Sequence, residues 1–380
     1  MATASSSAQL ASELKGSKVL LTGITGFVGS ELARQLLELG AHVRAPTRWP
    51  IDSPKLAELK RNYDGLPGDV TFVDADIRSE DALAAALDGV SYIFHVASPF
   101  VITSPNPAED IVAPAVEGTA AMLRAAGRHK EHIKRVVVTS SVCAIHDCNA
   151  KQSPSSPSGR YTEADWNAVS TVEAEPYWVS KVEAERTAWR LAGELGLPLS
   201  TVLPNFVMGP VAAPQAASGI SVGFFKGFVE ASPGPDVKAP PSGVWTFADV
   251  RDVGRAHIAA AVVPAAAGRR YIVSARRSTS ARTVTDILKA RLPQLAGIPD
   301  GQSGDEAEMI DPSAVEADLG LKLTPVEDTL ADMAASLLKH GVAVPRAAGA
   351  GADATAKVAV GQVEAKTEAG EKVEEGGAKA

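Results

Sequence analysis

Short apolar runs alternate with longer stretches in which apolar residues recur every three or four positions through roughly the first half of the chain. The short runs predict buried strands, and the longer stretches predict helices with one face toward a core. The expected strands are Lys18–Thr22, His42–Ala45, Val70–Val73, Tyr92–Val96, Arg135–Thr139 and Leu199–Leu203. The expected helices are Ser30–Leu39, Ala108–Arg128 and Glu173–Leu195. This alternation predicts an α/β fold with a doubly wound parallel sheet of the Rossmann type.

The pattern changes after Pro204, where proline and glycine become frequent. We expect residues 18–203 to form the dinucleotide-binding Rossmann domain. Residues 204–346 are expected to form mainly a smaller C-terminal substrate lobe, with residues 244–263 returning to the main domain. The remaining expected elements are a helix at Val250–Val263, a strand at Arg270–Val273 and helices at Thr283–Leu292 and Pro325–His340.

The two ends of the chain differ in composition from the rest. Residues 1–17 are rich in Ala and Ser and lack the basic start and apolar core of a secretory signal, so we expect a flexible leader. Residues 347–380 are rich in Ala, Gly, Glu and Lys, without aromatic residues or Leu. Such a segment cannot bury enough surface to offset its ordering entropy, which predicts a disordered tail. A charged tail that docks a partner is the alternative.

Composition and charge disfavour several classes of function. The 380 residues carry a formal net charge of -8, which argues against a nucleic-acid partner. No apolar stretch approaches the roughly 18 residues of a membrane span, so we expect no membrane partner. Cys143 and Cys148 are the two cysteines of the chain, too few for a disulfide scaffold, and we expect reduced thiols and a cytoplasmic location. No metal-binding motif occurs, and we expect no metal.

Three glycines spaced three apart, Gly23, Gly26 and Gly29, follow the first predicted strand and open the first predicted helix. The first permits a tight turn, the second lets a pyrophosphate approach the backbone, and the third permits close contact between helix and strand. A flexible loop is the alternative, but it does not account for the flanking strand and helix. We expect the dinucleotide to contact Gly23, Thr25, Gly26, Phe27, Val28 and Gly29.

The end of the second strand suggests which dinucleotide is bound. An acid at this place would bind the adenosine ribose of NAD, but no acid occurs here before Asp52. Arg48 and Lys55 are suited to a 2′-phosphate, so we expect NADP(H). The alternative is that both are ordinary surface cations.

Two further strand ends supply candidate cofactor contacts. Asp76, with Ile77 beside it, follows the third strand and is suited to accept from the adenine amino group; the alternative is a helix N-terminal acid. Ala97 and Ser98 follow the fourth strand and are small enough to let a cofactor pass the sheet edge. His95 is interpreted as a hydrogen-bonded core histidine.

Tyr177 is the one tyrosine of five with a lysine four residues later, Lys181. On a helix these two side chains share a face. A nearby ammonium group is expected to lower the pKa of the phenol and ease proton exchange with a carbonyl oxygen. Ser141 ends a strand and is placed to polarise the same oxygen. A surface pair on a helix is the alternative interpretation of the Tyr-x-x-x-Lys spacing.

The chain resembles the extended short-chain dehydrogenase/reductase family, most of all its branch of dihydroflavonol reductase, cinnamoyl-CoA reductase and yeast-type carbonyl reductase. The resemblance covers about Lys18 to His340. It rests on a set of motifs: Thr22-Gly-Ile-Thr-Gly-Phe-Val-Gly29, Val43-Arg-Ala-x-x-Arg48, Phe94-His-Val-Ala-Ser-Pro99, Val116-Glu-Gly-Thr119, Val138-Thr-Ser-Ser141, Tyr177-Trp-Val-Ser-Lys181, Leu203-Pro-Asn-Phe-Val-Met-Gly-Pro210 and Phe247-Ala-Asp-Val-Arg-Asp-Val253.

The resemblance implies an NADPH-dependent reductase of a ketone or aldehyde, acting reversibly with a Ser-Tyr-Lys set. It places the catalytic serine at Ser141, with Ser140 as the second choice. It also places Pro204 and the backbone of Val207 against the nicotinamide carboxamide. The family usually carries an Asn shortly after the Gly-Thr of the long helix, whereas Thr119 is followed here by Ala-Ala-Met.

Three functions therefore compete. The first is an NADPH-dependent carbonyl reductase acting on a small molecule. The second is a 3β-hydroxysteroid dehydrogenase or a nucleotide-sugar epimerase or dehydratase of the same superfamily. The third is a non-catalytic cofactor-binding regulator, which the presence of Ser141, Tyr177 and Lys181 makes the least favoured.

Overall fold

The computed structural model describes residues 7–98, 101–147, 152–212, 214, 217, 219–232 and 238–345. The chain divides into two units, Met1–Ala348 and Gly349–Ala380. The second unit lies outside the described residues, and so does the predicted tail at 347–380. Cys148 is also outside them.

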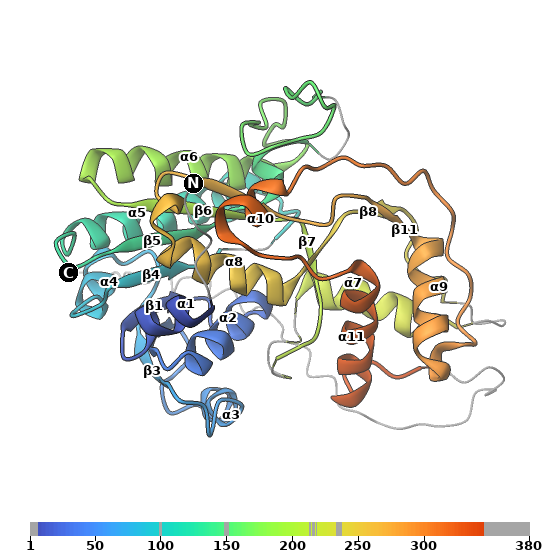
Figure 1. Ribbon diagram of the computed structural model, residues 1–380, viewed down its shortest axis with the longest axis horizontal. Coiled ribbons are helices and arrows are strands. Elements are labelled where there is room, and N and C mark those ends of the chain that lie inside the picture. The colour runs from blue at the N-terminus through green and yellow to red at the C-terminus, as the bar shows by residue number, and fades with distance from the viewer. Residues whose placement is uncertain are drawn as a thin grey trace, which may run out of the picture. The chain divides into compact units, whose positions relative to one another are not determined.

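A seven-stranded sheet forms the centre of the first unit, with strand order β10-β6-β5-β4-β1-β2-β3 (Figure 1). Every neighbouring pair in it is parallel. The strands are β1 (Lys18–Thr22), β2 (His42–Thr47), β3 (Asp69–Asp74), β4 (Tyr92–His95), β5 (Arg135–Thr139), β6 (Leu199–Pro204) and β10 (Arg270–Val273). The predicted α/β Rossmann fold is confirmed.

Strand β1 lies between β2 and β4, where the strand order reverses. Val19 pairs with Val43 of β2 on one side and with Tyr92 of β4 on the other. In open parallel sheets a ligand binds in the crevice beyond the carboxyl ends of the strands at such a point. The end of β1, with the glycine loop that follows it, therefore occupies the expected binding edge.

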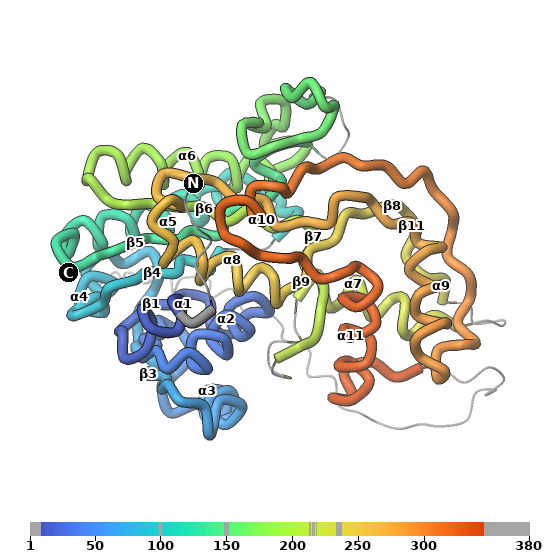
Figure 2. Tube along the Cα trace, in the orientation of Figure 1, coloured from blue at the N-terminus to red at the C-terminus, as the bar shows by residue number. Residues whose placement is uncertain are grey.

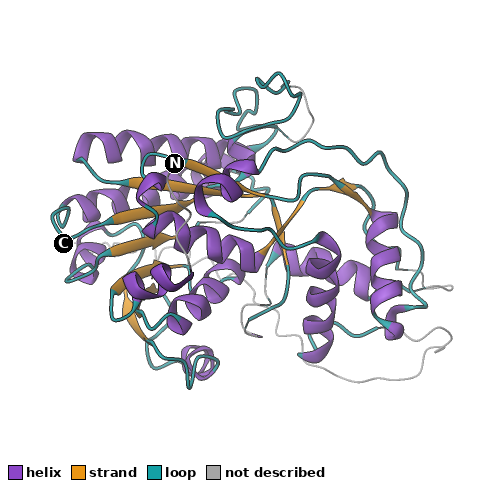
Figure 3. Cartoon of the chain, viewed as in Figure 1, coloured by secondary structure: helices purple, strands orange, loops and turns teal. Residues whose placement is uncertain are grey.

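Helices cover both faces of the sheet (Figure 3). One core layer joins the sheet to α2 (Phe27–Glu38) and α8 (Val250–Val262), and the other joins it to α4 (Glu80–Ala86), α5 (Ala113–Gly127) and α6 (Pro176–Leu195). Side chains of a strand alternate between the layers: Val19 and Leu21 enter the first, and Leu20 enters the second. Helices α2 and α8, far apart in sequence, lie in contact (Figure 2).

A separate core cluster joins the elements that follow β6, and aromatic side chains fill much of it. Phe206, Phe224, Phe228, Trp245 and Phe247 form a chain of ring contacts with centroids 4.8–6.4 Å apart. The elements of this part are β7 (Phe206–Met208), α7 (Ile220–Val229), β8 (Val244–Trp245), β9 (Phe247–Asp249), β11 (Thr279–Ser280), α9 (Ala281–Arg291) and α11 (Val326–Lys339). Helix α10 (Ser313–Leu319) instead packs Val315 and Leu319 into the first core layer of the sheet. Strand β7 pairs with β9, and β8 pairs with β11.

The predicted elements agree with the structure apart from their ends and a few omissions. The predicted helix at Ala108–Arg128 begins with a π-helical turn at Ala108–Val112 before α5. Helix α7 lies in the region between Gly209 and Gly243, where loops and short helices were expected, whereas helices α3 (Pro54–Arg61), α4 and α10 and the short strands β7, β8, β9 and β11 were not predicted. Both α3 and α4 have a serine cap, Ser53 and Ser79, which is a recognisable start signal.

The prediction that residues 1–17 are a flexible leader is wrong for the described part. Residues Ser7–Leu14 form helix α1, which contacts α8. Leu14 is fully buried, and Leu10 packs against the same core layer. Apolar residues four apart on one helical face gain enough burial to order a segment whose Ala and Ser content gave no such indication.

Candidate active site

The glycine loop is packed so tightly that side chains are excluded at two of its positions. Gly23 has φ +77°, and a β-carbon there would lie 2.9 Å from the Ala97 nitrogen. A β-carbon on Gly29 would lie 2.0 Å from the Gly23 carbonyl oxygen. Gly29 therefore permits the close contact that was predicted from the sequence.

Gly26 differs from the other two glycines. It is the N-cap of α2, and a β-carbon there would meet only the Gly23 carbonyl oxygen, at 3.4 Å, which is ordinary contact. No side chain caps α2, so its first turn presents backbone amides and the positive end of the helix dipole. Thr25, Phe27 and Val28 lie partly exposed around this turn. The cradle suits the phosphates of a dinucleotide.

Thr22 joins the ends of β1 and β4. Its hydroxyl accepts hydrogen bonds from the amides of Val96 and Ala97, at 3.1 and 3.0 Å, and it contacts His95 Nδ1 at 3.1 Å. Burial lowers the pKa of His95 to about 4, so the ring is neutral near pH 7. The interpretation of His95 as a hydrogen-bonded core residue is confirmed.

The expected 2′-phosphate contacts, Arg48 and Lys55, lie after β2 and in α3, and the expected adenine contact, Asp76, lies after β3. Arg48 is exposed directly after β2, and Lys55 lies over the ring of Trp49 with its ammonium 5.3 Å from the centroid. The carboxylate of Asp76 accepts hydrogen bonds from the backbone and side chain of Arg78. The pKa of Asp76 is lowered chiefly by these bonds and to a lesser extent by the charge of Arg48. Arg48 and Asp76 are thus near one another, whereas Lys55 is held by Trp49.

The remaining predicted cofactor contacts belong to neighbouring strand ends. Ile77 packs against α5, where its Cδ1 would lie 3.2 Å from a β-carbon on Gly118. Ser98 follows Ala97 beyond β4 and is partly exposed. Pro204 ends β6, and Val207 lies in β7 opposite Ala248.

The three proposed catalytic side chains meet where β5 ends and α6 begins. The Ser141 side chain interacts with the Tyr177 phenol and favours its ionised form. The Lys181 ammonium lies 5.4 Å from the centre of the Tyr177 ring. Ser141 caps a short 3-10 turn, Val142–Ala144, and accepts a hydrogen bond from the Cys143 amide at 3.2 Å. The helical spacing and the strand end therefore bring the three groups together.

The electrostatics of this group differ from the expectation in one respect. The pKa of Tyr177 is raised well above its usual value, because desolvation of the phenol outweighs the interaction with Ser141. Burial also lowers the pKa of Lys181 to about 8. The prediction that the lysine lowers the phenolic pKa is wrong, since burial disfavours both charged forms.

Ser140 and Ser141 have different partners. The Ser140 hydroxyl donates to the buried carboxylate of Glu185 at 2.7 Å, whereas the side chain of Ser141 interacts with the Tyr177 phenol. Ser141, not the second choice Ser140, is therefore the serine beside the phenol. Sequence reasoning missed Glu185, although it lies four residues beyond Lys181 on the same helical stripe.

Cys143 lies beside the same group of side chains. Its thiol is hydrogen-bonded to Ser141, and burial raises its pKa to about 11. A thiol with so high a pKa is a poor nucleophile near neutral pH.

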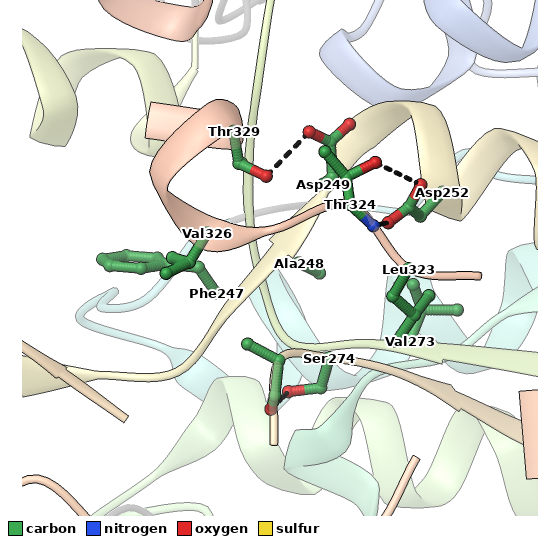
Figure 4. Close-up of a pocket in the computed structure, with 11 residues that line it drawn as sticks. Phe247, Ala248, Asp249, Asp252, Val273, Ser274, Leu323, Thr324, Val326 and Thr329 are labelled. Atoms are coloured by element: carbon green, nitrogen blue, oxygen red, sulfur yellow. Dashed lines mark hydrogen bonds between the residues drawn. The ribbon is translucent and has the colours of Figure 1, made fainter. Parts of the chain in front are cut away.

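Two pockets of the described residues lie away from this group. A small one, with space for about a single water molecule, is lined by residues of β9, α8 and the segment leading into α11 (Figure 4). In it Thr329 donates to Asp249, and Thr324 bonds to Asp252. The other lies along α5 and α6 and is lined by Val116, Glu117, Arg124, Thr187 and Arg190 among others. Neither includes Ser141, Tyr177 or Lys181.

Neither a metal site nor a membrane-spanning helix occurs in the part of the chain that the structure describes. No group of three or more His, Cys, Asp or Glu side chains is arranged to hold a metal ion there. Among the same residues, no helix has both the length and the apolar character needed to cross a lipid bilayer.

Comparison with known proteins identifies relatives over most of the chain. Residues 19–274 match the NAD dependent epimerase/dehydratase family. Tetraketide alpha-pyrone reductase 1 of Arabidopsis thaliana is 33% identical over 332 residues, covering 85% of this chain and 96% of that protein. Cinnamoyl-CoA reductase 1 of the same plant is 31% identical, with 87% and 92% covered.

Solved structures agree with the sequence relatives. The crystal structure of yeast methylglyoxal/isovaleraldehyde reductase Gre2 complexed with NADPH superimposes with a TM-score of 0.74. The two chains are 27% identical, and the match covers 86% of this chain and all of the other. The chain therefore belongs to the NAD dependent epimerase/dehydratase family, the extended short-chain dehydrogenases/reductases, as its motifs indicated.

Proposed function

We propose that the protein is an NADPH-dependent oxidoreductase that reduces a ketone or aldehyde to an alcohol, with the reverse oxidation also open to it. Ser141, Tyr177 and Lys181 form the proposed catalytic set. The observation that carries the proposal is the meeting of Ser141, Tyr177 and Lys181 at the carboxyl edge of the sheet, where Ser141 interacts with the Tyr177 phenol and Lys181 lies beside its ring.

The chemistry divides between cofactor and protein. NADPH, when bound, supplies the hydride. Tyr177 supplies the proton to the carbonyl oxygen, and its raised pKa keeps the phenol protonated for that role. Ser141 donates a hydrogen bond to the same oxygen and stabilises the charge that develops there. Lys181 stabilises the phenolate left on Tyr177 and holds the nicotinamide ribose.

The glycine cradle supports the cofactor part of the proposal. Gly23 and Gly29 leave no room for side chains, and no side chain caps the first turn of α2. Arg48 lies beyond β2, where an adenosine 2′-phosphate is expected, and no carboxylate ends that strand. A similar reductase from yeast was crystallised with NADPH, and other similar proteins are named as reductases of plants.

The finer assignments belong to the same proposal. Residues 18–203, with 244–263, form the cofactor domain, and 204–346 form mainly the substrate lobe. Asp76 and Ile77 lie at the adenine, Ala97 and Ser98 lie along the cofactor, and Pro204 and Val207 lie at the nicotinamide. The substrate is a small carbonyl compound, and the protein acts in the cytoplasm.

A panel of ketones and aldehydes, with NADPH oxidation as readout, tests the proposal. Wild type should oxidise NADPH in the presence of at least one carbonyl compound and form the alcohol. Tyr177→Phe should bind NADPH and show no turnover. Purified protein that carries tightly bound NAD and interconverts nucleotide sugars without net cofactor consumption would instead indicate an epimerase.

A further inference from the structure

Tyr177, Lys181 and Glu185 follow one another at four-residue intervals along α6, so they form one stripe on the helix. The Glu185 side chain is fully buried. Eight residues of helix place it about 12 Å along the axis from Tyr177, too far to reach a carbonyl at the phenol. Glu185 therefore belongs to the stripe but not to the reacting group.

The Glu185 carboxylate is hydrogen-bonded to three neighbouring strands. Arg270 of β10 donates from Nε to Oε1 at 2.8 Å and from Nη2 to Oε2 at 3.0 Å. Thr201 of β6 donates to Oε1 at 2.8 Å, and Ser140, directly after β5, donates to Oε2 at 2.7 Å. One carboxylate thus fixes α6 to the ends and edges of β5, β6 and β10.

Arg270 is itself held on its remaining side. Its Nη1 donates to the carbonyl oxygens of Glu163 and Asp165, both at 2.7 Å, and its guanidinium lies 3.9 Å from the centre of the Trp166 ring. The guanidinium plane is therefore fixed by partners on the loop that leads into α6. A rigid fork of this kind orients the carboxylate that it binds.

Adjacent serines connect this network to the catalytic set. Ser140 donates a hydrogen bond to Glu185, and the side chain of Ser141, the next residue, interacts with the Tyr177 phenol. The end of β5 is therefore attached to α6 at two points eight residues apart. Rotation or sliding of α6 against β5 would move the phenol relative to Ser141, and it would have to break the Ser140–Glu185 bond.

We infer that Glu185, held by Arg270 and Ser140, is a positioning residue that sets the distance between Ser141 and the Tyr177–Lys181 pair. The inference rests on the proposed function. Buried ion pairs contribute little net stability compared with apolar replacements, because desolvation offsets their attraction. Register between two elements is a better-supported role for such a group, and here the register is that of the catalytic side chains.

The test combines three variants. Glu185→Gln keeps the side-chain shape but removes an acceptor oxygen and the charge. Ser140→Ala removes the Ser140–Glu185 bond and leaves the Arg270–Glu185 pair intact. Glu183→Gln makes the same chemical change at an exposed position of the same helix and serves as the matched control.

For folded Glu185→Gln we expect kcat to fall about 10- to 100-fold with the KM for NADPH nearly unchanged, since misplacement of about 1 Å costs that much. Ser140→Ala should lower kcat about 5- to 10-fold by the same route, and Glu183→Gln should not change it. Hydrogen exchange of peptide 176–184 should be faster in the first two variants only.

Three results separate the possible failures. A wild-type protein without NADPH-dependent activity would contradict the proposed function. The hydrogen exchange of peptide 176–184 would then be the remaining test of whether Glu185 positions α6. Active wild type, with folded Glu185→Gln and Ser140→Ala that keep the wild-type kcat, would overturn the inference. Unchanged exchange of that peptide in both variants would overturn it as well.

Discussion

Gly29 lies against Gly23 so closely that a β-carbon on Gly29 would come within 2.0 Å of the Gly23 carbonyl oxygen. The contact joins the first turn of α2 to the end of β1. It leaves no room for even one methyl group, so the whole loop must move to admit an alanine. The same contact holds the loop in the shape that the proposed cofactor site requires.

Gly29→Ala should therefore destabilise the fold by about 1–3 kcal/mol, the usual range for overpacking, and weaken NADPH binding. Thermal melting and cofactor titration by fluorescence measure the two effects. Gly193→Ala is the control, because nothing lies within 4 Å of a β-carbon at this position in α6. It should stabilise the protein by about 0.5–1 kcal/mol, and equal effects of the two changes would contradict the steric argument.

Tyr177→Phe should abolish turnover and leave NADPH affinity nearly unchanged, because it removes only the proposed proton donor. Steady-state kinetics and a binding titration on the same preparation measure the two quantities. Near-wild-type kcat in this variant would remove Tyr177 from the mechanism.

Ser141→Ala should lower kcat by roughly 10²-fold or more, because a donor to the carbonyl oxygen is lost. Ser140→Ala is the natural comparison, since its hydroxyl bonds to Glu185 instead. Ser140→Ala should lower kcat by a smaller factor than Ser141→Ala does. A larger loss from Ser140→Ala than from Ser141→Ala would reverse the assignment of the catalytic serine.

Arg48→Ala should remove most of the preference for NADPH over NADH. Charge-assisted hydrogen bonds of arginine with phosphate contribute about 1.5–3 kcal/mol, equivalent to about 10- to 150-fold in affinity. Wild type should thus prefer NADPH by about tenfold or more in kcat/KM, and NADH kinetics should be almost unaffected by the substitution. Arg61→Ala, an exposed arginine in the last turn of α3, is the control. Equal use of both cofactors by wild type would refute the role of Arg48.

The pKa of about 8 for Lys181 gives a pH prediction. Below that value the side chain is charged, and above it the ammonium that stabilises the phenolate is lost. The kcat/KM for carbonyl reduction, which reports ionisations of the free enzyme, should therefore fall as the pH rises through about 8. A profile that stays flat to about pH 10 would contradict this assignment, since an unperturbed lysine titrates near 10.4.

The strands could be predicted well because buried parallel strands are short β-branched runs; Arg135–Thr139 is correct at both ends. The meeting of Ser141 with Tyr177 followed from the shared edge of a parallel sheet and from helical spacing. The partners of Glu185 could not be predicted in this way. Arg270 is 85 residues further along the chain, and no periodic pattern relates the two positions.

The prediction for the N-terminal segment failed for a different physical reason. Helix α1 has few apolar residues, and its order depends on Leu14, which α8 and its neighbours bury. The phenolic pKa of Tyr177 was likewise mispredicted, because spacing indicates the nearby charge but not the extent of burial. Elements more than 100 residues away along the chain bury Leu14, and the packed site itself desolvates the Tyr177 phenol.

The late position of Arg270 has a consequence for biosynthesis. During translation, β5, β6 and α6 leave the ribosome well before β10. Until β10 follows, the Glu185 carboxylate lacks its partner Arg270, and the outer edge of β6 lacks the strand that pairs with it. A polypeptide released at Pro204 would contain Ser141, Tyr177 and Lys181, yet it would leave a negative charge uncompensated in its interior. The charge balance in the interior of the catalytic half therefore depends on a strand encoded much nearer the 3′ end of the message.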